Sequence, residues 1–297
     1  MYHIISNPKA GKRKSKKALR IVEEIFQARG VEYALHQTKA VGDATVITKK
    51  LSEEGATDFI VVGGDGTINE VLNGLKEPEK CRLGIIPAGT GNDFVDAAGI
   101  PMDTEKAVLN ILDGEAKETD YLTFGGVRCM NIGGLGIDVD VLERCQRGKM
   151  RGKLKYLMSL VTSLFKFKGV RVSIEENGEM KERNALLVAC CNGTKFGGGI
   201  KICPDAKIDD GKMNVMIVDL LGGVFSIIKA FIALLKGKIM TYPLVTHLLV
   251  DKIKIKALSP CPAQLDGEIS NNIVFDVKVC TGLKIFRKKA VPVRQGA

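Results

Sequence analysis

Short apolar runs alternate with helix-length amphipathic segments over roughly the first 125 residues of the chain. In order, these pieces are Tyr2–Ser6, Ser15–Arg29, Tyr33–Gln37, Asp43–Glu54, Phe59–Val62, Thr67–Leu75 and Arg82–Ile86. Such alternation is typical of a parallel sheet with helices on both faces. Phe59–Val62 and Leu83–Ile86 carry apolar residues on both faces, as expected of strands covered on both sides. The pattern predicts an α/β domain over residues 1–125.

From about residue 126 the pattern changes to successive strand-like runs. These are Arg128–Ile132, Val170–Glu175, Leu186–Cys191, Met213–Val218, Ile253–Lys256 and Ile273–Val279. Such a series favours an antiparallel sandwich, interrupted by two segments of helical character at Gly152–Phe167 and Val224–Lys236. We therefore expect a mainly β-sandwich domain over 126–282, with a strand-like tail at 283–297 that returns to the first domain.

The chain is basic, and its charge narrows the choice of partner. Its 297 residues include 44 Lys and Arg against 34 Asp and Glu, giving a formal charge of +10. This surplus favours an anionic partner such as a nucleotide, a membrane surface or a nucleic acid. The chain has no Trp and only 5% aromatic residues. Because bases stack on aromatic side chains, this composition argues against nucleic acid.

Cysteine, histidine and hydropathy patterns point to a cytoplasmic protein. The eight cysteines show no CxxC spacing and the three histidines lie far apart, so no zinc ribbon or redox pair is indicated. Free thiols in a reducing compartment fit this pattern. The start of the chain lacks the features of a signal peptide. The longest apolar stretch, Leu220–Leu235, is interrupted by glycines and a lysine and is too short to span a bilayer.

The strongest chemical signal is Gly63-Gly64-Asp65-Gly66-Thr67, between a buried strand and a helix expected to begin near Ile68. Glycines allow the backbone to approach a ligand closely, and a helix N-terminus offers unpaired N–H groups to phosphate. A carboxylate beside phosphates repels them unless a cation such as Mg²⁺ lies between. The alternative is a tight turn in which Asp65 caps the helix.

Two further loops repeat this design at neighbouring strand ends. Gly84–Phe94 passes through Ala88-Gly89-Thr90-Gly91-Asn92 and again places a carboxylate, Asp93, just after a Gly/Thr turn. Asn7–Lys12 follows the first strand and carries lysines that could neutralise phosphate oxygens. Because the carboxyl ends of parallel strands share one edge of a sheet, we expect the three loops to line one nucleotide-sized crevice.

At this point the sequence resembles the diacylglycerol kinase catalytic family, and within it the bacterial soluble lipid kinases. The resemblance extends over nearly the whole chain. It rests on an ordered set of motifs: Asn7-Pro8 with Gly11, Gly63–Thr67, Gly84–Phe94, Asn131–Gly136, Pro204-Asp205-Ala206 leading to Asp209-Asp210-Gly211, and Leu265-Asp266-Gly267-Glu268. A lone GGDGT is shared with NAD kinases and phosphofructokinases, whereas the ordered set is far more specific.

The resemblance implies an ATP site in the cleft between the domains, with Mg²⁺ at the phosphates. Asp65 and Asp93 correspond to carboxylates that organise catalytic Mg²⁺, and Asp120 corresponds to a further acidic position near the site. The positions implied to hold ATP are Asn7, Pro8, Lys9, Ala10, Gly11, Thr38, Gly63, Gly64, Asp65, Gly66, Thr67, Ile68, Asn69 and Thr90.

The second domain is implied to supply the base and a structural metal. Asp266 and Glu268 match a DGE motif whose Glu acts as general base toward the lipid hydroxyl; a solvated hairpin turn is the alternative. A structural Mg²⁺ is implied at Lys207–Lys212, held by the side chain of Asp210 and the carbonyls of Lys207 and Lys212. Asp-Asp-Gly is equally an ordinary turn. With base and ATP on different domains, domain closure is expected to be required.

Basic residues gather in three clusters, which are Lys9–Arg20, Arg144–Lys155 and Arg287–Arg294. They are either solvated faces or sites of docking on an anionic leaflet. The apolar stripes of residues 152–167 and 224–236 either pack in the core or gate a lipid cleft. A lipid kinase extracts its acceptor from a bilayer, so we expect peripheral contact with the inner membrane surface.

These features predict an ATP- and Mg²⁺-dependent lipid kinase that phosphorylates the hydroxyl of diacylglycerol or a related lipid alcohol, giving phosphatidate or its analogue. An NAD kinase is the second enzyme hypothesis, against which Asn7-Pro8 and Gly89–Asp93 argue. A non-catalytic lipid- or nucleotide-binding regulator is the third, and it would not need Asp65, Asp93, Asp266 and Glu268 together. The sequence is compatible with a homodimer.

Overall fold

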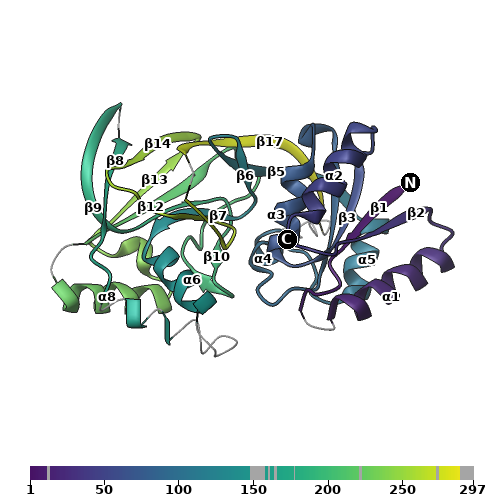
Figure 1. Ribbon diagram of the computed structural model, residues 1–297, viewed down its shortest axis with the longest axis horizontal. Helices are drawn as coiled ribbons and strands as arrows, with labels where there is room; N and C mark the ends of the chain where they lie inside the picture. Colours follow the sequence, from purple (N-terminus) through teal and green to yellow (C-terminus); the bar gives the residue numbers. More distant parts are fainter. Residues whose placement is uncertain are drawn as a thin grey trace, which may run out of the picture. The chain divides into compact units, whose positions relative to one another are not determined.

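The computed structural model describes residues 1–11, 14–147, 158–159, 161–163, 166–176, 178–220, 223–271 and 274–287. The chain divides into two compact units (Figure 1). Unit 1 comprises Met1–Thr119 with Gly282–Ala297, and unit 2 comprises Asp120–Thr281. Among the described residues, no helix is both long and apolar enough to cross a bilayer.

Unit 1 is built on a parallel sheet in the order β2-β1-β3-β4-β17, to which β17 (Phe275–Arg287) contributes its last residues, from Gly282. Its elements are β1 (Tyr2–Ser6), α1 (Lys14–Ala28), β2 (Tyr33–Gln37), α2 (Asp43–Glu53), β3 (Asp58–Gly63), α3 (Asp65–Gly74), the 3-10 turn η1 (Pro78–Lys80), β4 (Arg82–Pro87), α4 (Asp93–Ala97) and α5 (Thr104–Asp113). Figure 1 shows α1 and α5 on one side of this sheet and α2 and α3 on the other. The predicted parallel α/β domain is confirmed.

Burial on both faces explains the apolar strands of unit 1. Ile60 and Val62 of β3 pack with α1 and α5, where Phe26 of α1 is also fully buried. Phe59 and Val61 alternate with them and are 0% exposed on the other face. Because both faces of β3 are covered, the side chains that point to either face are buried. The strand is therefore apolar throughout.

Unit 2 is an antiparallel sandwich with helices on one outer side. Its elements are β5 (Glu115–Phe124, which begins in unit 1), β6 (Val127–Cys129), β7 (Ile132–Gly136), α6 (Ile137–Arg147), β8 (Val170–Glu176), β9 (Glu179–Cys191), β10 (Lys195–Phe196), β11 (Ile200–Lys201), β12 (Met213–Asp219), α8 (Gly223–Leu235), the 3-10 turn η2 (Ile239–Thr241), β13 (Val245–Val250), β14 (Lys252–Ala257), β15 (Ala263–Leu265), β16 (Glu268–Ser270) and β17 (Phe275–Arg287). The predicted β-sandwich is confirmed.

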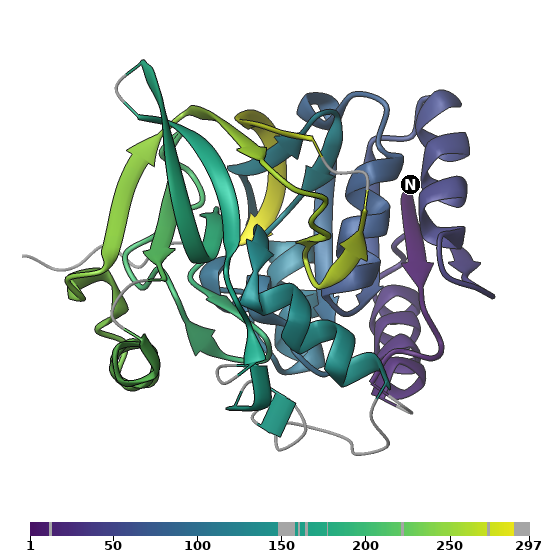
Figure 2. The same ribbon diagram turned by 60° about the vertical axis from the view of Figure 1, so that its left-hand side comes forward.

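The long strand β9 joins the two layers of the sandwich. Its first half pairs with β8, and its second half pairs with β7 on one side and β12 on the other. Val188 of β9 and Val215 of β12 lie in the core between the layers. Ala189 and Met216 face the opposite side, where α6 and α8 pack (Figures 1 and 2). The sheet at β12 is therefore covered on both faces.

Several predicted boundaries were wrong. The helix expected near Ile68 begins at Asp65, so this residue lies in the first turn of α3. Ile273–Val279 and the tail from 283 belong to one strand, β17, as far as Arg287. The helix expected at Gly152–Phe167 falls largely outside the described residues, as do most of the basic clusters Arg144–Lys155 and Arg287–Arg294.

Candidate functional site

The loops at the carboxyl ends of β1 and β3 are tied together by the side chain of Asn7. Its Nδ2 donates to Thr67 Oγ1 (3.4 Å), and its Oδ1 accepts from the backbone N–H of Lys9 (3.0 Å). The second bond closes a local turn that fixes Pro8, and the backbone N–H of Ala10 completes it by donating to the carbonyl of Asn7. Asn7 thus sets the position of this loop relative to the start of α3.

Two loops approach each other through glycines. A Cβ on Gly64 would lie 2.9 Å from the Cα of Gly89, and one on Gly89 would lie 2.5 Å from the Cα of Gly64. Any side chain at either position would therefore force the loops after β3 and β4 apart. Gly11 borders the second loop, because a Cβ there would overlap the carbonyl of Ala88. The phosphate-cradle motifs are thus joined at their backbones.

Asp65 and Asp93 line the same space beside Gly91. A Cβ on Gly91 would lie 3.0 Å from Asp65 Oδ2 and 3.5 Å from Asp93 Oδ2. The other oxygen of Asp65 accepts from the backbone N–H of Phe94 (3.3 Å), which fixes the carboxylate against the start of α4. No group of three or more His, Cys, Asp or Glu side chains suited to a metal occurs among the described residues. Two carboxylates nonetheless fit Mg²⁺, which typically takes one or two protein carboxylates and completes its shell with water and substrate phosphates.

The remaining predicted nucleotide positions contribute unequally. α3 has Gly64 as its N-cap with no side-chain cap, and a helix N-terminus of this kind can bind an anion. Thr38 lies beside the end of β1, because its N–H donates to the carbonyl of Ser6 (2.9 Å). Thr90 is exposed on the second loop. Ile68 is 1% exposed and its N–H is taken by Gly64, so it can offer a nucleotide neither group.

In unit 2, Asp266 acts as a brace for the turn that it begins. Its carboxylate accepts from three successive backbone N–H groups, those of Met130 (2.7 Å), Asn131 (2.9 Å) and Ile132 (3.1 Å). The thiol of Cys129 also donates to it (3.1 Å). Burial and the charge of Asp266 raise the pKa of Cys129 well above its usual value, so this thiol keeps its proton.

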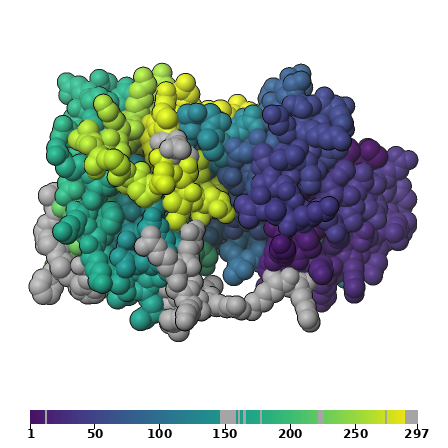
Figure 3. Space-filling model, in the orientation of Figure 1, coloured from purple at the N-terminus to yellow at the C-terminus, as the bar shows by residue number. Residues whose placement is uncertain are grey.

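Glu268 differs from Asp266, although only Gly267 separates them. Glu268 is exposed at the first position of β16, where it pairs in register with Leu265. Asp266 and Gly267 both have positive φ, 52° and 88°, which gives the sharp reversal between β15 and β16. Figure 3 shows that the segment after residue 250, coloured yellow-green to yellow, forms part of the exposed surface. The turn therefore presents Glu268 while Asp266 holds it from within.

Asp120 lies against the loop predicted to hold a structural metal. Its Oδ2 accepts from the backbone N–H of Gly211 (2.7 Å), and its own N–H donates to the carbonyl of Ile208. Asp210 accepts from the N–H of Lys212 (3.0 Å), as in an ordinary Asx turn. Burial raises the pKa of Asp120, and the neighbouring Asp209 and Asp210 raise it further, against the lowering effect of the Gly211 N–H. A cation in this loop would relieve that repulsion. Lys207 is exposed at its start.

Two buried asparagines link these acids and were not predicted as site residues. Asn192 is 0% exposed and donates from Nδ2 to the carbonyls of Asp120 and Met130 (both 2.7 Å). Asn131 donates to the carbonyl of Lys195 (2.9 Å). The Oδ1 atoms of Asn131 and Asn192 are buried without a hydrogen-bond partner among the described residues. Asn131 begins one of the motifs that carry the family resemblance, but no local pattern marks Asn192 or the hydrogen bonds of either residue, since the bonds connect segments more than 60 positions apart.

A second unpredicted feature is Asp138, in the first turn of α6. Its Oδ2 accepts from Gln264 Nε2 (3.1 Å), and Gln264 Oε1 accepts from the N–H of Gly267 (2.9 Å). The Oδ1 of Asp138 has no hydrogen-bond partner within the described part of the chain. Burial raises the pKa of Asp138 to about 6. A titratable group is thus connected through one glutamine to the turn that presents Glu268.

An apolar cavity lies under α8 in unit 2. It measures about 50 Å³ and is lined by Ile227, Phe231 and Leu234 of the helix and by sheet residues that include Leu186. Ile232 and Leu235 of α8 are 45% and 57% exposed. This helix therefore presents apolar side chains both to a cavity and to solvent.

Comparison with known proteins agrees with this arrangement. The family profile for the diacylglycerol kinase catalytic domain matches residues 1–124, and that for the YegS C-terminal NAD kinase beta sandwich-like domain matches residues 132–286. The chain is 31% identical over 271 residues to a diacylglycerol kinase of Bacillus subtilis, covering 89% of this chain and 88% of the relative. It is 30% identical over 278 residues to one from Staphylococcus carnosus, covering 91% and 89%.

Solved structures give the same result for the fold. The crystal structure of a proposed diacylglycerol kinase from Bacillus anthracis superposes with a TM-score of 0.81 at 26% identity, covering 98% of this chain and 96% of that chain. The profile over unit 2 matches more than half of the chain, and the sequence relatives are matched over most of their length. The chain belongs to the diacylglycerol kinase family.

Proposed function

We propose that this kinase transfers the γ-phosphate of ATP to the hydroxyl of diacylglycerol or a related lipid alcohol, giving phosphatidate or its analogue. The observation that carries the proposal is the pair of carboxylates, Asp65 and Asp93, held in one space between two glycine-joined loops at the start of α3. Phosphoryl transfer chiefly requires positioning and neutralisation of charge, which such a cradle supplies.

The residues of unit 1 are assigned to the nucleotide. Asn7–Gly11, Thr38, Gly63–Asn69 and Thr90 surround the phosphates and the nucleoside, with the helix N-terminus directed at phosphate oxygens. Asp65 and Asp93 would hold Mg²⁺, which would neutralise charge on the transferring phosphoryl group. In this assignment Ile68 serves the fold, because its side chain is buried and its N–H is used within α3.

The residues of unit 2 are assigned to the acceptor. Glu268 takes the proton of the lipid hydroxyl. The oxygen of that hydroxyl bonds to the γ-phosphorus, and the bond from this phosphorus to the bridging oxygen of ADP breaks. Asp266 positions Glu268 by fixing the turn, and Asp120 with Lys207, Asp210 and Lys212 forms a structural cation loop. Since such acceptors reside in bilayers, we place the enzyme in peripheral contact with the inner membrane surface. The cysteine pattern, which fits free thiols, places it in the cytoplasm.

The test is transfer of labelled phosphate from ATP, with Mg²⁺, to a panel of lipid alcohols in mixed micelles, with NAD as a control acceptor. We expect label on diacylglycerol or a related lipid alcohol and none on NAD. Glu268→Gln should abolish transfer, whereas Glu179→Gln, an exposed acid elsewhere in unit 2, should not. Label on NAD alone would instead establish a nucleotide kinase. NAD is tested because the profile that matches unit 2 describes an NAD kinase beta sandwich-like domain.

A further inference from the structure

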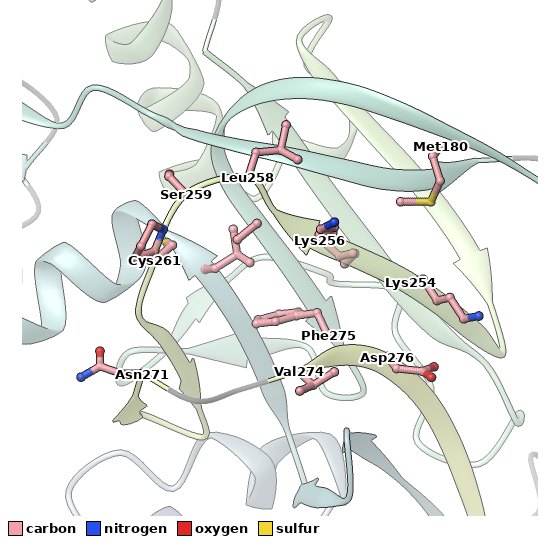
Figure 4. A pocket seen from close by; sticks show the side chains of 14 residues that line it. Met180, Lys254, Lys256, Leu258, Ser259, Cys261, Asn271, Val274, Phe275 and Asp276 are labelled. Carbon is pink, nitrogen blue, oxygen red and sulfur yellow. The ribbon is translucent and has the colours of Figure 1, made fainter.

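A second, larger groove lies in unit 2, at the end of β14 and the start of β17. Its volume is about 660 Å³, within the range of ~300–1,000 Å³ usual for ligand pockets. Figure 4 shows Phe275 in the middle of the groove, with Cys261 and Asn271 toward one end and Lys254 and Asp276 toward the other. Nothing in the proposed phosphoryl transfer uses this groove.

The rim of the groove carries large apolar side chains in contact with solvent. Val274 is 62% exposed, Met180 is 51% exposed and Leu258 is 37% exposed, whereas Phe275 at the floor is 6% exposed. Single exposed apolar residues are ordinary on a protein surface, but three around one groove indicate an interaction site. The apolar part of the groove therefore fits a hydrocarbon chain.

Two lysines, Lys254 and Lys256, line the same rim, and Lys252 and Lys278 lie further along the same two strands, outside the groove. Lys252, Lys254 and Lys256 alternate along the exposed face of β14, and Lys278 of β17 lies directly opposite Lys252 in register. None of these four lysines forms an ion pair within the described part of the chain. Like charges placed directly across two strands repel. The single acid on this rim, Asp276, is opposite Lys254 in register, so the charge that remains is positive.

The groove is also continuous with the hairpin that carries Glu268. Cys261 lies two residues before β15 begins, and Asn271 follows directly after β16 ends. A molecule in the groove would therefore contact Cys261 just before the β15–β16 hairpin and Asn271 just after it. Its binding would stabilise the position of the hairpin and hence that of Glu268.

We propose that this groove binds an anionic phospholipid of the bilayer, with an acyl chain on Phe275, Leu258 and Val274 and the phosphate at Lys254 and Lys256. The proposal rests on the proposed function, because it supposes an acceptor that lies in the same bilayer. A diacylglycerol carries no charge for the lysines to meet. The occupant is therefore a neighbouring anionic lipid that docks the enzyme.

The absence of tryptophan from the chain allows a direct test of docking. Val274→Trp would place a single fluorophore at the groove. Its emission should shift to shorter wavelength with vesicles of phosphatidylcholine containing phosphatidylglycerol, and stay unchanged with phosphatidylcholine alone. Leu249→Trp, on β13 and 55% exposed, is the matched control and should not respond.

Charge reversal tests the basic rim. In the Val274→Trp background, Lys254→Glu/Lys256→Glu should raise the lipid concentration at half-maximal shift at least about tenfold, given the attraction of each lysine to an anionic surface. Lys49→Glu/Lys76→Glu makes the same change in charge at exposed positions of unit 1. It should alter the lipid concentration at half-maximal shift by less than twofold. An equal response to both vesicle types, or a shift with soluble phosphatidate but not with phosphatidylglycerol vesicles, would overturn the proposal.

Activity separates this proposal from the proposed function. On a short-chain diacylglycerol dissolved as monomers, Lys254→Glu/Lys256→Glu should keep activity within about twofold of the parent, while activity on acceptor in anionic vesicles falls at least tenfold. If the parent phosphorylates no lipid but the Val274→Trp signal behaves as expected, the proposed function fails and the groove assignment stands. If the parent phosphorylates diacylglycerol but the signal ignores anionic vesicles, the groove assignment fails alone.

Discussion

The two acidic turns of this kinase, one in each unit, are built in opposite ways. At the start of α3, one oxygen of Asp65 accepts a hydrogen bond from the N–H of Phe94, and the other faces the space that Asp93 also lines. In the turn between β15 and β16, the carboxylate of Asp266 accepts from three backbone N–H groups and a thiol. In unit 1 the glycines shape the turn and the acid faces a ligand space. In unit 2 the acid shapes the turn, and a second acid, Glu268, is presented.

Because of this difference, substitutions at the two turns should affect activity and stability separately. One oxygen of Asp65 accepts from the backbone N–H of Phe94 (3.3 Å), and an asparagine in its place could still accept this bond, so the charge of Asp65 can be removed with little effect on folding. A carboxylate that satisfies several buried donors cannot be removed so readily, since each unpaired donor costs about 1–3 kcal/mol. Substitutions at the two turns should therefore give different combinations of lost activity and lost stability.

The largest effect should come from Asp65→Asn. We expect kcat to fall on the order of 10³-fold, equivalent to about 4 kcal/mol of transition-state stabilisation, because one of the two carboxylates proposed to hold Mg²⁺ is lost. The free energy of unfolding should change by less than about 1 kcal/mol, the usual contribution of an acid in the first turn of a helix. Kinetics with lipid micelles and urea unfolding measure the two quantities. Activity within tenfold of the parent would remove Asp65 from the metal site.

Asp266→Ala should mainly destabilise unit 2. Three N–H groups of buried residues would lose their acceptor, so we expect the free energy of unfolding to fall by at least about 3 kcal/mol, with activity lost as the turn relaxes. Glu268→Gln is the matched control, two residues away and exposed, and should lose activity at nearly unchanged stability. Equal urea midpoints for Asp266→Ala and the parent would contradict the comparison between the turns.

The contrast between the turns also explains what could be predicted from sequence. The cradle of unit 1 is local: its glycines and acids adjoin two apolar strands, so the motif, the sheet and the meeting of loops at one edge were all predictable. The brace of unit 2 is not local, since Asp266 and the N–H of Asn131 are 135 positions apart. Only the resemblance to a family drew attention to Asp266, and it gave no indication of the bonds that the carboxylate makes.

Missed helices have a comparable physical cause. In α6, Ile137, Val139 and Val141 alternate with Asp138 and Asp140, which is the pattern of a strand with one buried face. All three apolar residues are buried in the helix, and Asp138 is only 5% exposed. The sequence has no helical periodicity here because this helix is covered on more than one side and includes a buried acid, which is rare. α5, with an Asp103 N-cap that accepts from the N–H of Lys106 (3.0 Å), carried a recognisable start that was overlooked.

Asp138→Asn should change the pH dependence of stability, because Asp138 is a buried acid linked through Gln264 to the turn between β15 and β16. Burial raises the pKa of Asp138 to about 6 from its usual 3.8, so the folded state favours the protonated form. Ionisation therefore destabilises the protein progressively as the pH rises from about 4 to 6, by up to about 3 kcal/mol above pH 6. Relative to the variant, the parent should regain a little under half of this stability, about 1.3 kcal/mol, on acidification from pH 7 to pH 5, and the rest below pH 5.

Urea unfolding of parent and variant at pH 5, 6 and 7 measures that difference, in which contributions of the other titrating groups cancel. Cys261, the other titratable group noted beside Asp138, has a pKa raised by burial and by this carboxylate, so it stays protonated in this range. Parallel curves for the two proteins would show that Asp138 is ionised in both states or neutral in both. The link from Asp138 through Gln264 to Gly267 would then have no influence on the turn.

The smallest effect should come from the loop beside Asp120. If Asp210 contributes to a structural cation site, Mg²⁺ at about five times its dissociation constant should stabilise the parent by roughly 1 kcal/mol, seen as a rise in melting temperature. Asp210→Asn should abolish this rise, whereas Asp205→Asn on the same loop should retain it. Sodium chloride at equal ionic strength controls for screening. An equal rise in Asp210→Asn would place the cation elsewhere, leave the loop as an ordinary turn, and make Asp120, like Asp266, an acid that braces the backbone.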